Sequence, residues 1–251
     1  MGSITASPAA ADLKLADVID VGIDQPIPSE ALTRILSKPP FLIVEGGFNI
    51  RDSGHIGHPG IQPGLIYRSG LLANLTEIGA PAPIIPSNFA AKNGNDAYRD
   101  MYLDILESHV PSFSGLLTYV RDELNARSGG ENRAVPFHCH AGKDRTGVAS
   151  ALLLSLGGVL DKLIARDYAL TRVGIETEKE YLLRSLQQAW PECAAGAAGF
   201  KEFADTKASY MMTFLEAVKV KYGGMEKFVV DVIGMSKADI EALRGVLRGE
   251  S

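Results

Sequence analysis

Short apolar runs separated by glycine and proline predict strands in several places along the chain. Residues 41–44 and 65–67 are such runs, and the glycine-rich stretch between them, 46–64, is typical of a loop. Residues 134–139 form another short, mostly apolar run, preceded by charged and glycine-rich sequence. Because turn residues bound each of these runs, we predict a strand at each of them.

Apolar positions at helical spacing predict helices over much of the remainder. In residues 113–127 the apolar side chains include Leu116, Val120 and Leu124, which share one face of a helix. Residues 79–97 carry several prolines and few helix or strand signals, so we expect an irregular connection there. The predicted helices cover residues 29–37, 98–107, 113–127 and 148–156 and most of 160–248, where Ser236 and Asp239 resemble a capping box.

The order of these elements indicates the fold class and the domain organisation. Strands early and helices late favour a layered α/β or α+β domain with a helical C-terminal part. The 251 residues contain no linker rich in proline, glycine and serine, so we expect a single domain over residues 13–251. Residues 1–12 are small and polar, which is typical of a disordered tail.

Charge and cysteine content exclude several classes of protein. A net charge of −5 argues against nucleic acid as a partner, because nucleic-acid binders are usually basic. The two cysteines, Cys139 and Cys193, do not suggest a disulfide framework in a chain of this length, and they suit a reducing compartment. The first residues lack the pattern of a signal peptide, and no run is as long as a membrane span. We therefore expect a cytoplasmic protein without an integral membrane segment.

The string HCHAGKDRTG, from His138 to Gly147, carries the clearest chemistry. Cys139 ends a predicted strand, and a predicted helix follows the glycine-containing loop, so backbone N–H groups can converge there on a phosphate dianion. The same field favours the thiolate of Cys139, the form that acts as a nucleophile. The alternative for Cys139 is a buried small hydrophobic residue. The predicted phosphate-binding residues are His140, Ala141, Gly142, Lys143, Asp144 and Arg145.

Individual side chains around the loop have expected roles. Arg145 can grip two phosphate oxygens side by side, and Lys143 would add a point charge near the rim. The hydroxyl of Thr146 could reach the sulfur and steady the leaving thiolate, and His138 could fix the loop through a backbone hydrogen bond. For Thr146 and His138 a purely structural role is an equal alternative. Cys193 has no basic neighbours and is interpreted as structural.

Other candidate sites are weaker. His55 and His58 lie three residues apart in a glycine-rich loop, but no cysteine or carboxylate cluster joins them, so no metal site is predicted. Gly46, Gly47 and Gly54 do not follow a dinucleotide-binding pattern and are interpreted as turns. We therefore expect no cofactor and no metal.

The loop resembles the signature of the protein tyrosine phosphatase superfamily, and its Lys-Asp pair is similar to the atypical tyrosine/serine phosphatases of bacteria and fungi, some of which act on phosphoinositides. Residues 48–52, 67–71 and 166–171 are similar to three further motifs of that family. The resemblance implies a central, largely parallel sheet flanked by helices. It also implies hydrolysis of phosphate monoesters through a phosphocysteine at Cys139.

The resemblance extends to substrates and supporting residues. It implies phosphotyrosine, and also phosphoserine or phosphothreonine, in a phosphorylated protein partner. The alternative is a phosphoinositide, which would need a wider, more basic rim. Arg51 and Asp52, which belong to one of the matching motifs, are expected to brace the site by an ion pair rather than to touch substrate.

Two questions stay open in the sequence. The family has a core strand ending in Asp-Leu-Arg after the second motif, and here residues 74–83 offer no clear equivalent, so the chain could be a shortened, catalytically weak phosphate-binding homologue. The general acid is the second question: Asp144 is favoured, with Asp100 and Asp104 on a predicted helix as alternatives. Sulfur or arsenate chemistry on a similar cysteine loop fits the string poorly.

Overall fold

The computed structural model describes residues 13–72, 86–125, 134–190, 194 and 196–250. The expected tail at 1–12, most of the segment in which the core strand would fall, and Cys193 lie outside the described residues. Among the helices that the structure does describe, none is both long enough and apolar enough to cross a membrane.

A small mixed sheet forms the base of the fold. Its described strands are β1 (Arg51–Asp52), β2 (Ile66–Ser69) and β3 (Val135–His138), with β2 in the middle. β2 pairs antiparallel with β1 and parallel with β3, so the parallel arrangement expected for most of the sheet is present in one of the two described pairs. In the parallel pair Ser69 lies opposite His138, which brings the carboxyl ends of β2 and β3 together.

The strand predicted over residues 41–44 is wrong. Phe41 alone forms a bridge, to Arg51, while Leu42, Ile43 and Val44 are exposed, Ile43 to 76%. An apolar run becomes a strand only where neighbouring backbone and a buried face are available to it. Here the chain leaves the sheet after Phe41, so the remaining apolar side chains point into solvent.

The central helix is α5 (Asp144–Leu156), which follows β3 directly through the loop. It packs against β2, β3, α3 and α6, and from Thr146 to Leu154 every one of its side chains is buried. A helix that is apolar on all sides is expected to lie inside a protein. The helix begins at Asp144, four residues before the predicted start at Val148, because the last residues of the loop already form its first turn.

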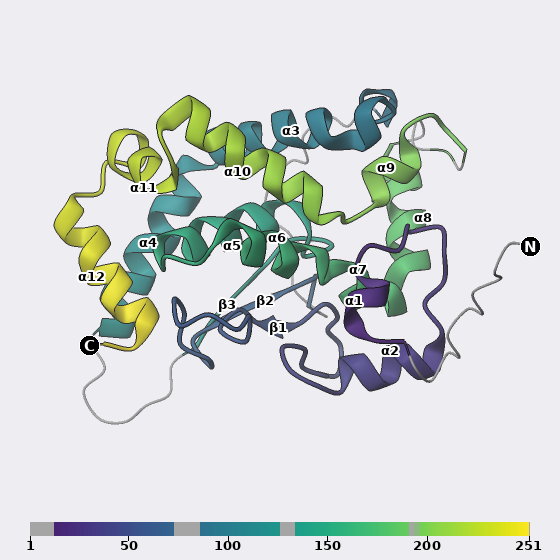
Figure 1. Cartoon of the computed structure of the whole chain (residues 1–251), viewed down its shortest axis with the longest axis horizontal. Helices are drawn as coiled ribbons and strands as arrows, with labels where there is room; N and C mark the ends of the chain where they lie inside the picture. The colour runs from purple at the N-terminus through teal and green to yellow at the C-terminus, as the bar shows by residue number, and fades with distance from the viewer. Residues whose placement is uncertain (1–12, 73–85, 126–133, 191–193, 195, 251) are drawn as a thin grey trace, which may run out of the picture.

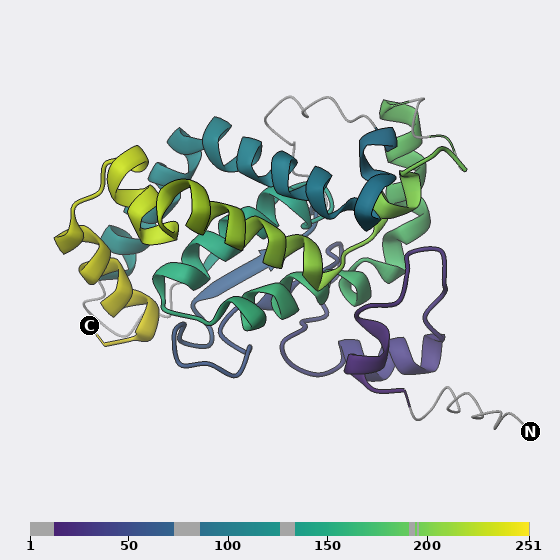
Figure 2. The same ribbon diagram turned by 45° about the horizontal axis from the view of Figure 1, so that its top comes forward.

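Further helices cover α5. α6 (Asp161–Ala169) lies beside it, and α10 (Ala208–Tyr222) packs on α6 and on α3 (Asn95–Ser108). Figure 1 shows the strands at the bottom, α5 and α6 in the middle and α10 and α3 at the top, and Figure 2 shows α10 lying across the middle layer. The α3–α10 contact includes Tyr98 stacked on Tyr210, with ring centroids 4.1 Å apart.

The remaining elements surround these layers. α12 (Lys237–Arg248) begins with the predicted capping box, in which Ser236 Oγ accepts from the Asp239 amide at 3.1 Å, and it packs on α4 (Val110–Asn125). In the described part of the predicted irregular connection, two short 3₁₀ turns precede α3. The other elements are α1 (Leu15–Val18), α2 (Ser29–Leu36), η2 (Pro86–Phe89), η3 (Ala91–Gly94), α7 (Thr171–Gly174), η4 (Glu176–Glu178), α8 (Lys179–Ala189), α9 (Phe200–Ala204), α11 (Met225–Phe228) and the π-helix η6 (Val229–Ile233).

Candidate active site

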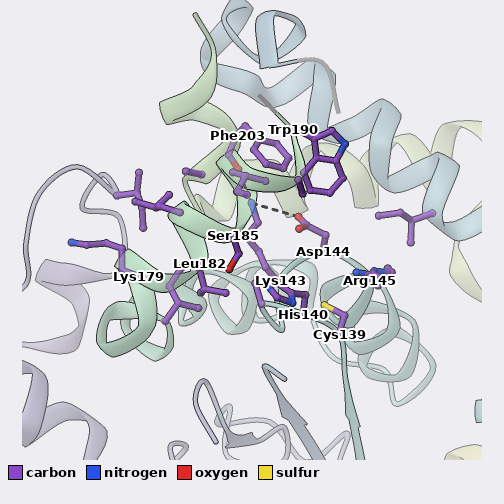
Figure 3. Close-up of a pocket in the computed structure, with 18 of the residues that line it drawn as sticks. Cys139, His140, Lys143, Asp144, Arg145, Lys179, Leu182, Ser185, Trp190 and Phe203 are labelled. Carbon is purple, nitrogen blue, oxygen red and sulfur yellow. Dashed lines mark hydrogen bonds and ion pairs between the residues drawn. The ribbon is translucent and has the colours of Figure 1, made fainter. Parts of the chain in front are cut away.

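A cavity of about 350 Å³ opens at the junction of β3 and α5. Its lining includes all the predicted phosphate-binding residues except Gly142, together with Cys139. In the view of Figure 3, Asp144 lies between Cys139 and the rings of Trp190 and Phe203. The loop that the sequence singled out therefore forms one wall of this cavity, whose volume is in the range of small-molecule sites.

Cys139 is placed by the end of β3. It is the first residue after the strand, and its side chain is in the cavity wall with an exposed fraction of 6%. The loop then leads into the N-terminus of α5, where unsatisfied backbone N–H groups and the helix dipole attract anions. A cysteine thiol and a helix N-terminus are thus adjacent at this end of the cavity.

Gly142 faces away from the cavity because the loop packs tightly against β2. Its φ is +68°, and a Cβ built there would lie 2.3 Å from the carbonyl oxygen of Ser69, so no larger residue fits. The carbonyls of Ala141 and Gly142 accept hydrogen bonds from Asn49, at 3.0 and 3.3 Å. In a trans peptide the N–H points opposite to the carbonyl, so the amides of Gly142 and Lys143 point away from Asn49.

Two buried guanidinium groups and one carboxylate brace the loop from behind. Asp167 receives Arg51 Nε on Oδ1 at 3.1 Å and Arg68 Nη1 on Oδ2 at 2.6 Å, and all three side chains are about 1% exposed or less. Arg68 Nη2 also donates to the Gly142 carbonyl at 3.0 Å, and Arg51 Nη2 donates to Thr171 Oγ1 at 3.0 Å. Residues from the three further motifs, 48–52, 67–71 and 166–171, therefore meet behind the loop that joins β3 to α5.

The brace carries a net positive charge. Burial acts to raise the pKa of Asp167, but Arg51 and Arg68 outweigh it, so the pKa lies below its usual value. Burial, reinforced by the nearby Arg68, lowers the pKa of Arg51. With an ionised carboxylate and two guanidinium cations, these three side chains together carry one net positive charge.

Arg51 and Asp52 do not share an ion pair, which corrects the expectation that they act together. Successive side chains of a strand point to opposite faces, so the two residues meet different partners. Asp52 instead accepts hydrogen bonds from the amides of Gly54 at 2.8 Å and Gly64 at 2.6 Å, and its Oδ2 is 2.8 Å from His55 Nδ1. Asp52 therefore organises the glycine-rich turn, and of these two residues only Arg51 belongs to the brace.

Lys143 lines the cavity, but its ammonium is buried rather than placed near the rim as the sequence-based expectation had it. Its side chain is 5% exposed, and its ammonium donates to Tyr98 Oη at 2.5 Å and to the Phe203 carbonyl at 2.7 Å. The nitrogen also lies over both rings, 5.0 Å from the centroid of Tyr98 and 4.9 Å from that of Phe203. Burial lowers the pKa of Lys143. Lys143 thus ties the loop to α3 and to the end of α9.

Replacing Lys143 with methionine should destabilise the fold, because the Phe203 carbonyl would stay buried without its charged donor. We expect the free energy of unfolding in urea to fall by about 2–3 kcal/mol, the scale for a buried hydrogen bond from a charged group. Lys201→Met is the control, since Lys201 makes an exposed ion pair with Asp24 and its loss should leave the free energy of unfolding nearly unchanged. Equal stability of the two variants would contradict the tether.

Of the three candidate acids, Asp144 alone lines the cavity. It is the first residue of α5, its side chain is 26% exposed, and its Oδ1 accepts a hydrogen bond from Tyr102 Oη at 2.9 Å. Asp100 pairs with the neighbouring Arg99 on the surface of α3, and Asp104 is exposed on the same helix. The geometry therefore favours Asp144.

Thr146 and His138 lie next to the site without lining the cavity. The Thr146 hydroxyl is buried and has no hydrogen-bond partner among the described residues, so its expected contact with the sulfur is not formed here. The Nδ1 atom of His138 lies 3.3 Å from the carbonyl oxygen of Cys139, at the start of the loop. Arg145, which follows Asp144, lines the cavity together with Cys139.

The far walls of the cavity were not assigned by sequence reasoning. They are largely apolar and come from α8, α9 and α3; their members include Leu182, Leu183, Leu186, Trp190, Phe203 and Ile105. The sequence pattern that could have revealed these walls is the helical spacing of apolar residues 182, 183 and 186, which marks one face of α8 and continues to Trp190 directly after the helix. That face is only half-buried, because it borders the cavity.

Residues 80–249 match the sequence model of the tyrosine phosphatase family. The chain is similar to a tyrosine-protein phosphatase of Nostoc commune, with 31% identity over 153 residues, 59% of this chain and 48% of that protein. It is also similar to the triple specificity protein phosphatase PtpB of Mycobacterium tuberculosis, with 29% identity over 124 residues, 47% and 45% of the two chains. A putative tyrosine-protein phosphatase of Cupriavidus necator is 27% identical over 147 residues, 58% and 48% of the two chains.

The family match covers well over half of the chain and includes the whole loop from Cys139 to Arg145. The chain therefore belongs to the tyrosine phosphatase family, and the resemblance read from the sequence is confirmed. The chain spans about half the length of the curated relatives that it matches.

Proposed function

We propose that the chain is a cysteine-dependent phosphatase that hydrolyses phosphate monoesters through a phosphocysteine at Cys139. The observation that carries the proposal is the meeting of Cys139, Asp144 and Arg145 in one cavity at the N-terminus of α5. A thiol nucleophile, a carboxyl group for proton transfer and a two-pronged cation are the groups that such a reaction uses. The matched family supports the same chemistry.

The reaction has two steps. The Cys139 thiolate attacks phosphorus, the S–P bond forms as the ester P–O bond breaks, and Asp144 gives its proton to the leaving oxygen. Water then attacks phosphorus, Asp144 takes a proton from it, and the S–P bond breaks to release phosphate and the thiolate. In both steps the loop amides and Arg145 stabilise the charge on the equatorial oxygens.

The walls of the cavity favour an aryl phosphate, and phosphotyrosine in a protein is the proposed substrate. The leucines of α8 and Phe203 give the cavity an apolar lining against which a planar ring would pack. A phosphoinositide headgroup would need additional cations, but Lys143 is buried and Lys179 is held by Glu176 at 3.0 Å. Phosphoserine and phosphothreonine have shorter, less apolar bodies and would fill the cavity less well.

Initial rates of phosphate release test this substrate class. The substrates are a phosphotyrosine peptide, the same peptide with phosphoserine, and a phosphatidylinositol phosphate in vesicles. We expect the highest kcat/KM with the phosphotyrosine peptide. A faster reaction with the vesicles would contradict the aryl assignment, and no release from any substrate would contradict the proposed activity.

Replacing Arg145 with lysine should slow turnover strongly, because lysine keeps the charge but loses the planar fork. We expect kcat/KM for an aryl phosphate to fall by about two orders of magnitude or more, the scale for losing a transition-state donor. Arg166→Lys is the matched control, since Arg166 is exposed on α6 and does not line the cavity. If both variants kept the wild-type rate, Arg145 would have no part in the reaction.

A further inference from the structure

A chain of buried hydroxyl groups ends on the proposed general acid. Tyr102 of α3 lies with its hydroxyl 2.9 Å from Asp144 Oδ1 and 2.7 Å from the hydroxyl of Tyr168 on α6. Both tyrosines are completely buried, so water does not compete for these contacts. Three helices thus contribute one group each to a line that leads from the core to the cavity.

The direction of these hydrogen bonds follows from counting hydrogens. A phenol has one hydrogen to donate, and an ionised carboxylate can only accept. Tyr102 therefore donates to Asp144 Oδ1 when Asp144 is ionised, and Tyr168 donates to the oxygen of Tyr102. Burial raises the pKa of Tyr102 and of Tyr168 well above the usual value, so both hydroxyls keep their hydrogens.

A second group acts on the same carboxyl oxygen. The ammonium of Lys143 lies 3.6 Å from Asp144 Oδ1 and is fixed in place by Tyr98 and the Phe203 carbonyl. One donor and one cation therefore face Oδ1. Because the hydrogen bond from Tyr102 occupies Oδ1, Oδ2 is the oxygen better suited to carry the proton when Asp144 takes one up.

We infer that Tyr102, supported by Tyr168, is a positioning residue for Asp144: its hydrogen bond to Oδ1 fixes the carboxyl group and reserves Oδ2 for the proton that reaches the leaving oxygen. The inference rests on the proposed function. The proton leaves Oδ2 as the ester P–O bond breaks, and a proton of the attacking water returns to Oδ2 as the S–P bond breaks. Tyr102 keeps its own hydrogen throughout.

The same inference gives a role to Tyr168, which belongs to the third family-like motif. Its neighbour Asp167 pairs with Arg51 and Arg68, while Tyr168 turns to the other side of α6 and meets Tyr102. The motif thus supports the nucleophile loop with one residue and the acid with the next.

The test compares two tyrosine-to-phenylalanine variants on two substrates. 4-Nitrophenyl phosphate has a leaving group that barely needs a proton, whereas phenyl phosphate depends on the acid. Tyr102→Phe should lower kcat on phenyl phosphate by about tenfold or more and change kcat on 4-nitrophenyl phosphate much less. Complete loss of general acid catalysis typically costs about a hundredfold or more, and a misplaced acid should lose part of that factor. Tyr210→Phe is the control, because its hydroxyl donates instead to the backbone carbonyl of Glu202, at 3.1 Å.

A double-variant experiment separates positioning from a general structural effect. The ratio compared is kcat on phenyl phosphate divided by kcat on 4-nitrophenyl phosphate. Asp144→Asn should lower this ratio, and adding Tyr102→Phe to that variant should not lower it any further. If Tyr102→Phe fails to fold, Tyr168→Phe removes the supporting donor and should shift the ratio in the same direction by a smaller factor. The inference is overturned if neither Tyr102→Phe nor Tyr168→Phe, where it folds, changes the ratio. It is also overturned if Tyr210→Phe lowers the ratio as much as they do.

The outcomes also distinguish the inference from the proposed function. If the wild-type protein releases phosphate and Asp144→Asn lowers the ratio, but Tyr102→Phe resembles Tyr210→Phe, the positioning role is wrong and the proposed phosphatase activity still stands. If Asp144→Asn leaves the ratio of rates unchanged, the acid assignment and the inference are wrong together while turnover still stands. If wild-type protein releases phosphate from neither substrate, the proposed function and the inference are both overturned.

Discussion

Replacing Cys139 with serine should abolish turnover and leave phosphate binding largely intact. A serine hydroxyl is a far weaker nucleophile at neutral pH than a thiolate. We expect kcat to fall by about five orders of magnitude, the scale on which loss of an enzyme nucleophile is felt. The loop amides and Arg145 remain, so calorimetric binding of inorganic phosphate or tungstate should change by less than about tenfold.

The matched control for this prediction is Cys193→Ser, which removes the other thiol of the chain. That variant should keep the wild-type rate. Acid quenching during turnover should also yield a phosphorylated protein in the wild type and none in Cys139→Ser. More than trace turnover by Cys139→Ser would rule out the phosphocysteine mechanism, even if the chain were a phosphatase.

The arrangement of the loop could be predicted because its residues are consecutive in the sequence. Cys139, Asp144 and Arg145 lie within one short strand–loop–helix unit, and an apolar run followed by a glycine-containing loop and a helix has few possible geometries. The path of the backbone therefore follows from local sequence, and with it the set of groups that border the loop. The confirmed capping box of α12 is local in the same sense.

The position of Lys143 could not be predicted, because its partners are distant in sequence. Its ammonium binds the Phe203 carbonyl sixty residues later, and nothing near the loop indicates that α9 ends there. A lysine in a polar string is normally expected to point into solvent. The Tyr98 hydroxyl, the Phe203 carbonyl and the faces of both rings compensate the burial of the ammonium, and only the assembled fold brings these groups together.

The brace was only half predictable for the same reason. The family-like motifs marked Arg51, Arg68 and Asp167 as noteworthy, but the sequence does not say which carboxylate meets which arginine. Proximity in sequence favoured Asp52 as the partner of Arg51. The strand period places Asp52 on the opposite face, and the helix α6 supplies Asp167 instead.

Replacing Asp167 with asparagine should destabilise the protein more than any other single change at the site. The variant would leave two guanidinium groups buried side by side without their shared counter-ion, and removing one partner of a buried ion pair typically costs about 3–5 kcal/mol. We expect that loss in the free energy of unfolding in urea at pH 7. Asp161→Asn is the control, because Asp161 pairs with the exposed Lys219 and should cost less than about 1 kcal/mol.

The difference between wild type and Asp167→Asn should also depend on pH with a defined sign. The pKa of Asp167 is lower in the folded chain than in the unfolded chain, so its contribution is fully present above the unfolded pKa, near 4, and is lost as pH falls through the folded pKa. The two unfolding free energies should therefore differ most at neutral pH and converge in acid. A difference that stayed constant from pH 7 to pH 3, or a variant as stable as Asp161→Asn, would show that the ionised carboxylate does not hold the two arginines in place.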